Sequence, residues 1–153
     1  MSNGKAVKIG ELSMDVVKIL GLSIKPGTPI YLGQSNISHM QNRHPEDYAK
    51  YGSYIREIIS TPDYVGINPS DDSIEYTKDF KADNDYVKVA VRVSLSGTYF
   101  ARSLFTRNRA KIERFIASGK LKPLTTRTSI AHNINGEDNL EDLEDGTGGR
   151  RPS

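Results

Sequence analysis

The hydrophobic positions near the start of the chain recur with helical spacing. Within residues 11–20, the apolar side chains at Leu12, Val16, Ile19 and Leu20 follow an i, i+4, i+7, i+8 pattern. This pattern predicts a helix with one apolar face, which Gly21 can end as a C-cap. After a turn at Lys25-Pro26-Gly27, the short apolar run 30–32 is typical of a strand.

Two further helical segments meet at His44. The first begins at Ser35 or Asn36 and runs to Arg43, and the second begins at Pro45, a first helical position that suits proline because its missing N–H needs no partner there. One face of the second segment is apolar (Tyr48, Tyr51, Ile55, Ile58 and Ile59), and Pro62 ends it. The pattern predicts a helix–helix corner with His44 at its elbow and His39 about one turn earlier.

The second half of the chain changes to the alternation of strands. Segments 64–67, 73–80, 86–94 and 98–105 are separated by turn signals at 68–71 and 96–97. In the clearest strand, four valines point one way, while Lys88 and Arg92 point the other way and are expected to face outward. In the return strand, Arg102 shares a side with Phe100 and Leu104, a conflict that a β-bulge would resolve. A basic helix follows over 108–117, closed by Gly119.

This order of elements predicts an α+β fold. We expect N-terminal helices packed on one face of a small, about four-stranded antiparallel meander, followed by a C-terminal helix. The predicted organisation is a helical extension over 1–24, the main domain over 25–122, and a flexible tail over 123–153 that is first Thr-rich and then acidic and disordered.

Composition narrows the possible functions. The 153 residues include no cysteine, which excludes disulfides, thiolate metal sites and cysteine nucleophiles. Since the chain has neither an apolar run of about 20 residues nor a signal-peptide pattern, we expect no membrane contact and a cytoplasmic location in a bacterial host. A phage or other mobile element could deliver the protein elsewhere.

The net charge of +2 hides an uneven distribution. Residues 132–153 carry six acids against Arg150 and Arg151, and so hold −4, whereas residues 1–131 hold +6. Segment 102–127 is the most basic, with a single acid, Glu113, among eight cations (Arg102, Arg107, Arg109, Lys111, Arg114, Lys120, Lys122 and Arg127). Such a stretch suits a phosphate backbone, although it also describes an ordinary solvated helix face.

His39 and His44 are the candidates for acid–base chemistry, because imidazole both takes and gives a proton near neutral pH. Single histidines are more often caps or surface residues. Five residues correspond to about 140° around a continuous helix, so the two rings converge only if the corner folds suitably. A zinc site is less favoured, since the third ligand would have to come from Glu46, Asp47 or Glu57. The chain has no phosphate-binding glycine loop and no serine nucleophile elbow.

Several segments together carry a family resemblance: Pro29–Pro45 with its His-Met-Gln-Asn-Arg-His-Pro, Ile55–Tyr64, Ser73–Tyr76, Val87–Val93 and Gly97–Phe105. In these segments the chain resembles a phage-encoded member of the barnase, EndoU, colicin and RelE-like (BECR) nucleases. The resemblance covers about residues 25–116. It implies helices followed by a four-stranded antiparallel meander, and toxin-like endonucleolytic cleavage of RNA by acid–base chemistry with neither a metal nor another cofactor.

The resemblance also implies a site that combines histidine with cationic and hydroxyl side chains from helix and sheet. We therefore expect one of His39 and His44 to act as general base on the 2′-hydroxyl and the other as general acid at the leaving oxygen. Arg92, Arg102 and Tyr99 complete the expected catalytic set. The expected substrate-binding residues are Lys88, Thr98, Ser103, Arg107, Arg109 and Arg114.

The expected partner is RNA, and an active ribonuclease would also need an antitoxin or immunity protein. Other functions stay open at this point: a non-catalytic nucleic-acid-binding module, a factor that inhibits a host protein, or a metal-dependent nuclease. The acids of residues 137–145 could also mimic a phosphate backbone and occupy the basic surface, although a solubilising tail is the simpler interpretation.

Overall fold

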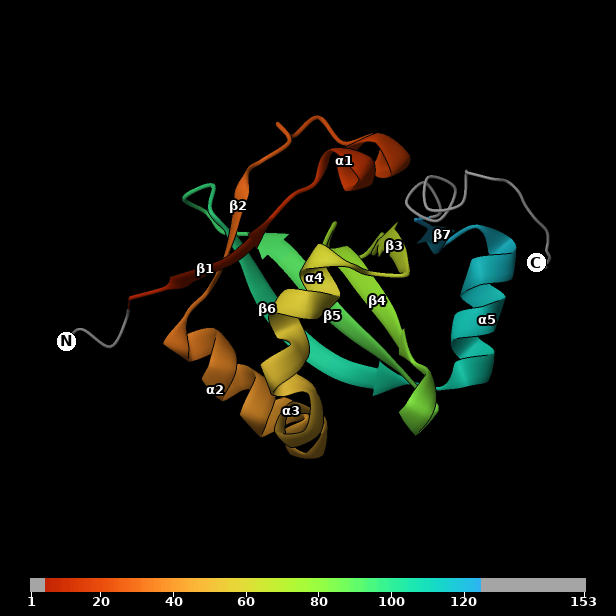
Figure 1. The fold of residues 1–153 in the computed structure, drawn as a ribbon. Coiled ribbons are helices and arrows are strands. Elements are labelled where there is room, and N and C mark those ends of the chain that lie inside the picture. Colours follow the sequence, from red (N-terminus) through yellow and green to blue (C-terminus); the bar gives the residue numbers. More distant parts are fainter. Residues whose placement is uncertain (1–4, 125–153) are drawn as a thin grey trace, which may run out of the picture.

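The computed structural model describes residues 5–124, which form a seven-stranded mixed sheet with helices (Figure 1). In chain order the elements are β1 (Val7–Glu11), α1 (Met14–Leu20), β2 (Pro29–Leu32), α2 (Gln34–Arg43), α3 (Pro45–Tyr51), a 3₁₀ turn (Gly52–Tyr54), α4 (Ile55–Ser60), β3 (Tyr64–Ile67), β4 (Ile74–Phe80), a 3₁₀ turn (Lys81–Asp83), β5 (Asp85–Val93), β6 (Tyr99–Arg107), α5 (Arg109–Ser118) and β7 (Lys122–Pro123). Within this part of the chain, no helix is long and apolar enough to cross a membrane.

The sheet has the strand order β1-β2-β6-β5-β4-β3-β7. Strands β3 to β6 form the expected antiparallel meander, but the expectation of about four strands in all was wrong. β2 extends the sheet by pairing in parallel with β6, through Ile30 opposite Tyr99 and Tyr31 opposite Phe100. β1 and β7 then add one antiparallel strand at each edge, beside β2 and β3.

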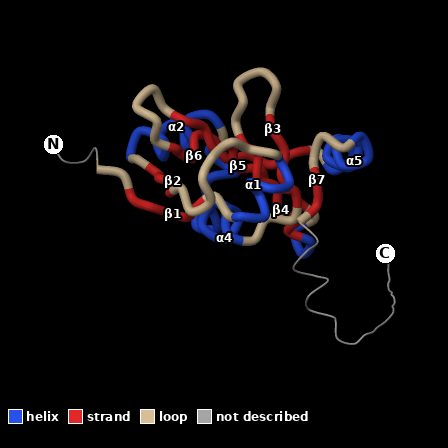
Figure 2. The backbone as a smooth tube through the Cα atoms, turned by 90° about the horizontal axis from the view of Figure 1, so that it is seen from above, coloured by secondary structure: helices blue, strands red, loops and turns tan. Residues whose placement is uncertain are grey.

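Helices lie on both sides of the sheet (Figure 2). Val87, Val89 and Val91 of β5 face α2, α3 and α4, and pack in the main apolar cluster with Met40, Ile58 and other residues of these helices. We call this face the helix side. The opposite face carries Tyr86 and Lys88 and is partly covered by α5, whose Ile112 packs with Tyr86 in a second, smaller cluster. We call it the α5 side.

The expected bulge is present in β6. Ala90 of β5 is opposite Ser103, whereas the next residue, Val91, is opposite Ala101, so Arg102 is the extra residue. The bulge puts Ala101 and Leu104 on the same, fully buried side of the strand although three positions separate them. The bulge therefore explains why strict alternation put Arg102 on the same side as the apolar Leu104.

Capping residues in the sequence predicted most of the helix ends correctly. Asn108 accepts the Lys111 N–H at the start of α5, and Gly119 ends that helix with a left-handed φ of 85°. The helix expected from Pro45 onward is instead divided by the turn at Gly52–Tyr54.

The expected domain boundaries stay predictions. The structure does show Ile9, Leu12 and Val16 inside the main apolar cluster, together with residues of the meander. The acidic tail lies outside the described residues.

Candidate active site on the sheet

A polar pocket lies on the α5 side of the sheet. It has a volume of about 190 Å³ and is lined by four sheet residues, the β3–β4 loop, α5 and the segment that follows α5 (Ile67, Asn68, Pro69, Ser70, Glu75, Lys88, Arg107, Phe115, Lys120 and Leu121). We call it the sheet pocket. Its position follows from the strand register, since Glu75 and Lys88 come from neighbouring strands and share a face of the sheet.

The centre of the sheet pocket is a buried ion pair. Lys88 is only 1 % exposed, and its Nζ lies 2.9 Å from Oε1 of Glu75. Asn68 donates a hydrogen bond to the other carboxylate oxygen, at 3.2 Å. Burial lowers the pKa of Lys88, an effect that the bond to Glu75 opposes. The expectation that Lys88 faces outward was wrong, because α5 covers this part of the strand.

Arg107 adds a second cation to the sheet pocket. Its guanidinium carbon lies 5.0 Å from the centre of the Phe105 ring. Its Nε is buried and has no hydrogen-bond partner among residues 5–124. The pocket thus contains Lys88, Arg107 and Lys120 against one carboxylate, Glu75. A site with excess positive charge and an unused N–H donor is suited to an anionic ligand such as a phosphate.

His44 lies next to these groups, at the edge of β6. Its ring stacks on Phe105 with centroids 5.0 Å apart and an interplanar angle of 29°. Phe105 is also the cross-strand partner of Lys88 and the ring over which Arg107 lies. The structure therefore brings His44, Arg107 and Lys88 around one phenylalanine ring.

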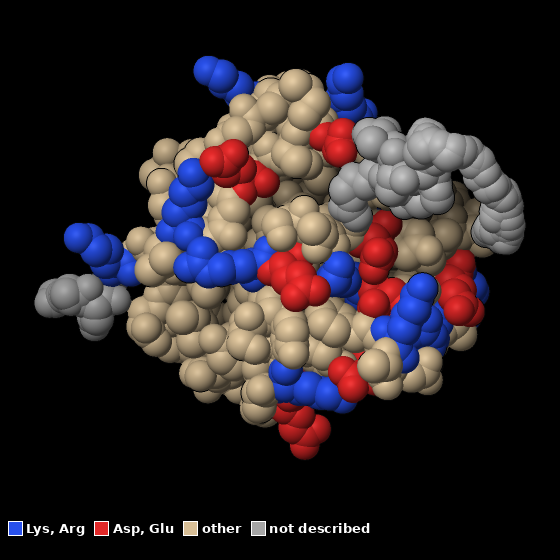
Figure 3. All heavy atoms as spheres, in the orientation of Figure 1, with Lys and Arg blue, Asp and Glu red and all other residues tan. Residues whose placement is uncertain are grey.

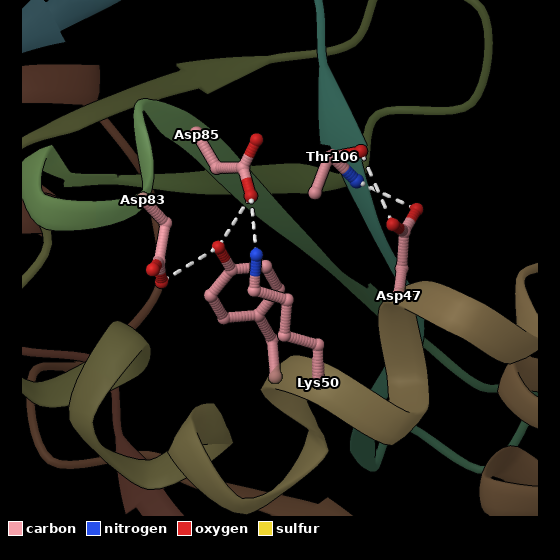
Figure 4. Close-up of polar contacts among 6 residues, drawn as sticks. Asp47, Lys50, Asp83, Asp85 and Thr106 are labelled. Atoms are coloured by element: carbon pink, nitrogen blue, oxygen red, sulfur yellow. Dashed lines mark hydrogen bonds and ion pairs between the residues drawn. The ribbon is translucent and has the colours of Figure 1, made fainter.

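The helix–helix corner that carries His44 is fixed to the sheet at both ends of α3. At its start, Asp47 accepts hydrogen bonds from the backbone N–H and the hydroxyl of Thr106, at 2.9 and 3.2 Å (Figure 4). At its end, Lys50 pairs with Asp85 at 3.4 Å, and the Tyr51 hydroxyl lies within hydrogen-bond distance of Asp83 and Asp85. Burial, followed by these carboxylates, raises the pKa of Tyr51.

The other expected catalytic residues are not gathered at this point. His39 is exposed in the middle of α2, and the continuous helix from there to Arg43 keeps it about 140° from His44 around the axis. Arg92 lies four residues beyond Lys88 along β5, which is about 13 Å in a strand. Arg92 and Tyr99 line a different hollow. Arg102 is the exposed bulge residue.

The expected substrate-binding residues also divide into groups. Lys88 and Arg107 line the sheet pocket, and Ser103, partner of Ala90, lies on the same face of the sheet. Arg109 is held by Asp79 through two contacts of 3.3 Å, and its guanidinium carbon lies 4.2 Å from the centre of the Tyr86 ring, so it is engaged within the protein. Arg114 is exposed on α5, and Thr98 lies in the turn just before β6.

Sequence reasoning missed Glu75, Phe105 and Lys120. The signal for Glu75 was its position between Ile74 and Tyr76 in a predicted strand, since a carboxylate there needs a cation when a helix covers its face of the sheet. The helix side has no comparable excess of cations: Figure 3 shows acidic and basic side chains interspersed over it.

Among the described residues, no group of three or more His, Cys, Asp or Glu side chains could hold a metal ion.

The fold and the sheet pocket define an α+β protein with a partly buried pocket on its sheet in which cations outnumber carboxylates. Comparison with protein families then identifies the family to which the chain belongs. Residues 7–114 match the model of the phage-Barnase-EndoU-ColicinE5/D-RelE like nuclease3 family, and the chain belongs to that family of nucleases. A search of curated proteins and a search of solved structures each found no significant match.

Proposed function

We propose that the protein is an endoribonuclease that cleaves RNA at the sheet pocket, by attack of the 2′-hydroxyl and without a metal ion. The observation that carries the proposal is the set of Lys88, Arg107 and Glu75 in one pocket, with His44 next to it across Phe105. Cleavage of this type requires a base, an acid and cations around the phosphate, and this set provides all of them.

Each group has a role that follows from its surroundings. Glu75 takes the proton of the 2′-hydroxyl, whose oxygen then bonds to phosphorus. Lys88 and Arg107 stabilise the additional negative charge on the phosphoryl oxygens, which is the role a metal ion plays in other nucleases. His44 gives a proton to the 5′-oxygen as the bond between that oxygen and phosphorus breaks. The products are a 2′,3′-cyclic phosphate and a 5′-hydroxyl.

This assignment revises the two-histidine mechanism expected from the sequence. The carboxylate acts as the base in place of a histidine, because Glu75 lies within the pocket whereas His39 is at an exposed position on α2. His44 keeps one of the two roles expected for the histidines, that of the general acid. Arg107 takes the position expected for Arg92, because it is the guanidinium that contacts the ring beneath His44.

The direct test measures RNA cleavage by Glu75→Gln against wild type, with the exposed Glu46→Gln as the matched control. Loss of a general base lowers the rate about 10²- to 10⁴-fold, and the control should stay close to wild type. The substrate is a single-stranded RNA of mixed sequence, in buffer with EDTA. A 2′-deoxy residue at the cleaved position should block the reaction.

Three outcomes would contradict the proposal. Full activity of a stably folded Glu75→Gln would exclude this carboxylate as the base. Cleavage that EDTA abolishes would indicate a metal-dependent nuclease. Tight RNA binding without cleavage between pH 5 and 9 would favour a binding module, and binding to a protein without RNA affinity at low salt would favour an inhibitor.

A further inference from the structure

A second hollow lies at the other end of the same strands, and nothing in the proposed reaction uses it. It has a volume of about 420 Å³ and is lined by Leu22, Ile24, Ile67, Asp71, Asp72, Ile74, Arg92, Val93 and Tyr99. We call it the apolar hollow. Its floor consists of aliphatic side chains and one aromatic ring, and its rim carries two carboxylates and one guanidinium.

The apolar hollow is open to solvent despite its apolar lining. Ile67 is 39 % exposed and Val93 is 45 % exposed, and the adjacent turn carries the fully exposed Leu95. The volume falls in the range typical of small-ligand sites, and apolar side chains that stay accessible in such a site commonly contact a ligand. The question is therefore which ligand these particular side chains fit.

The strand geometry connects the apolar hollow to the sheet pocket. Lys88 and Arg92 point to the same side of β5, about 13 Å apart. The β3–β4 loop separates the two sites, and Ile67 lines both of them. Ile74 and Val93 belong to the helix side and Arg92 to the α5 side, so the apolar hollow lies around the end of these strands. A single strand of RNA with one phosphate at Lys88 and a later phosphate at Arg92 can therefore place a base past the end of β5, in the hollow.

The charges on the rim favour a base over a peptide side chain or a second phosphate. Arg92 offers a cation to the backbone, whereas Asp71 and Asp72 offer acceptors to N–H groups. The backbone N–H of Ser73 donates to Asp71 and lowers the pKa of that carboxyl, an effect that Arg92 reinforces, so the acceptor is ionised at neutral pH. An aromatic or apolar floor with polar acceptors at its rim is the usual setting for an unstacked base.

We infer that the apolar hollow binds one unpaired base of the RNA, with its phosphate on Arg92 and its amino group toward Asp71 and Asp72. The inference rests on the proposed function and adds a determinant of specificity to it. Since adenine, cytosine and guanine carry exocyclic amino groups and uracil does not, uracil should be the weakest of the four at this position.

The test measures binding of the full chain to short single-stranded oligonucleotides that have a 2′-deoxy residue at the cleaved position. Each base in turn is replaced by an abasic site. With wild-type protein, one position beyond the cleaved phosphate should weaken binding about tenfold to hundredfold when its base is removed. With Val93→Asp, the same removal should cost less than about threefold, because the base no longer contributes.

Val7→Asp is the matched control, since Val7 is 54 % exposed on β1 and does not line the apolar hollow. It should keep the wild-type pattern of abasic effects. Val93→Thr keeps the β-branched shape, and it replaces Val93→Asp if that variant has a markedly lower melting temperature. It should reduce the abasic effect in the same direction.

The outcomes separate this inference from the proposed function. If wild type cleaves RNA and Glu75→Gln does not, but the abasic effects are the same in wild type and in the folded Val93 variants, the base subsite is excluded and the sheet pocket stands. This is also the result expected if the hollow receives a protein partner instead. If no oligonucleotide binds and no RNA is cleaved, the proposed function fails and the subsite fails with it.

Discussion

The two faces of the central sheet hold their elements together by different means. On the helix side, Val89, Ile58 and Met40 are fully buried in a large, continuous apolar cluster. On the α5 side, the buried apolar cluster is small, consisting of Tyr86, Ile112 and Leu121, and a lysine–glutamate pair is buried beside it.

This difference indicates that the two faces serve different purposes. Apolar burial of the kind on the helix side is the main source of folding stability. A buried ion pair contributes little net stability, because desolvation offsets much of its attraction, but it holds charges at fixed positions for a ligand. We therefore expect mutations on the helix side to affect folding, and those around the sheet pocket to affect chemistry.

The largest expected effect is on the rate of RNA cleavage, and it differs between the two histidines of the corner. His44→Gln should reduce RNA cleavage about 10²- to 10⁴-fold, because it removes the acid next to the sheet pocket. His39→Gln should reduce cleavage less than about tenfold, since its side chain lies away from the pocket. Initial rates on the same RNA give the comparison, and equal losses in both variants would restore the two-histidine mechanism.

Truncation of a core side chain on the helix side should lower the stability of the protein and leave its cleavage rate unchanged. Ile58 is fully buried in α4, so Ile58→Ala should lower the free energy of unfolding by about 2–5 kcal/mol. Urea denaturation measures this loss. Below the lowered melting temperature, the cleavage rate should stay near that of wild type, and a specific loss of rate in the folded variant would refute the proposed division between the faces.

Breaking the buried ion pair should have a smaller effect on stability. Lys88→Met leaves the Glu75 carboxylate in a partly buried site without its cation, which should cost about 1–3 kcal/mol. Adding Glu75→Leu should recover most of that loss, because an apolar pair can replace a buried ion pair. Both variants should be inactive, and a double variant that is less stable than the single one would show that the pair contributes strongly to folding.

The smallest expected effect concerns Tyr86 at alkaline pH. Burial, with the nearby Asp79, raises the pKa of Tyr86 to about 12, above its ordinary value of 10.0. The unfolded chain loses this proton first, so the stabilising contribution is complete below pH 10 and is lost as the pH rises toward 12. Between these limits, wild type should lose up to about 1.4 kcal/mol per pH unit more than Tyr86→Phe. Urea titrations at several pH values measure the difference, and parallel curves would contradict it.

How much the sequence predicted depended on the range of the interactions involved. The strands β3 to β6, the bulge at Arg102 and the corner at His44 follow from local alternation, turn residues and Pro45. The parallel pairing of β2 with β6 joins residues about 70 positions apart, and no local pattern reports it. β1 was missed because, of its five residues, only Ile9 is buried.

The sequence predicted only those parts of the candidate site that depend on local patterns. The sequence predicted the helix–helix corner at His44, and its basic segment 102–127 contributes Arg107 and Lys120 to the sheet pocket. The burial of Lys88 depends on α5 folding back over β5, and its pairing with Glu75 depends on the register between β4 and β5. Both are tertiary relationships, so alternation alone assigned Lys88 to the solvent and did not single out Glu75.

The order in which the sheet pocket is assembled has a consequence during synthesis on the ribosome. Its lining begins at Ile67 and ends at Leu121, so Arg107 and Lys120 are synthesised after Glu75 and Lys88. A nascent chain that lacks α5 and β7 cannot close the pocket, even when the helices of its first half are complete. In a nuclease built in this way, the charged groups of the pocket come together only after α5 has been synthesised and has folded onto the sheet.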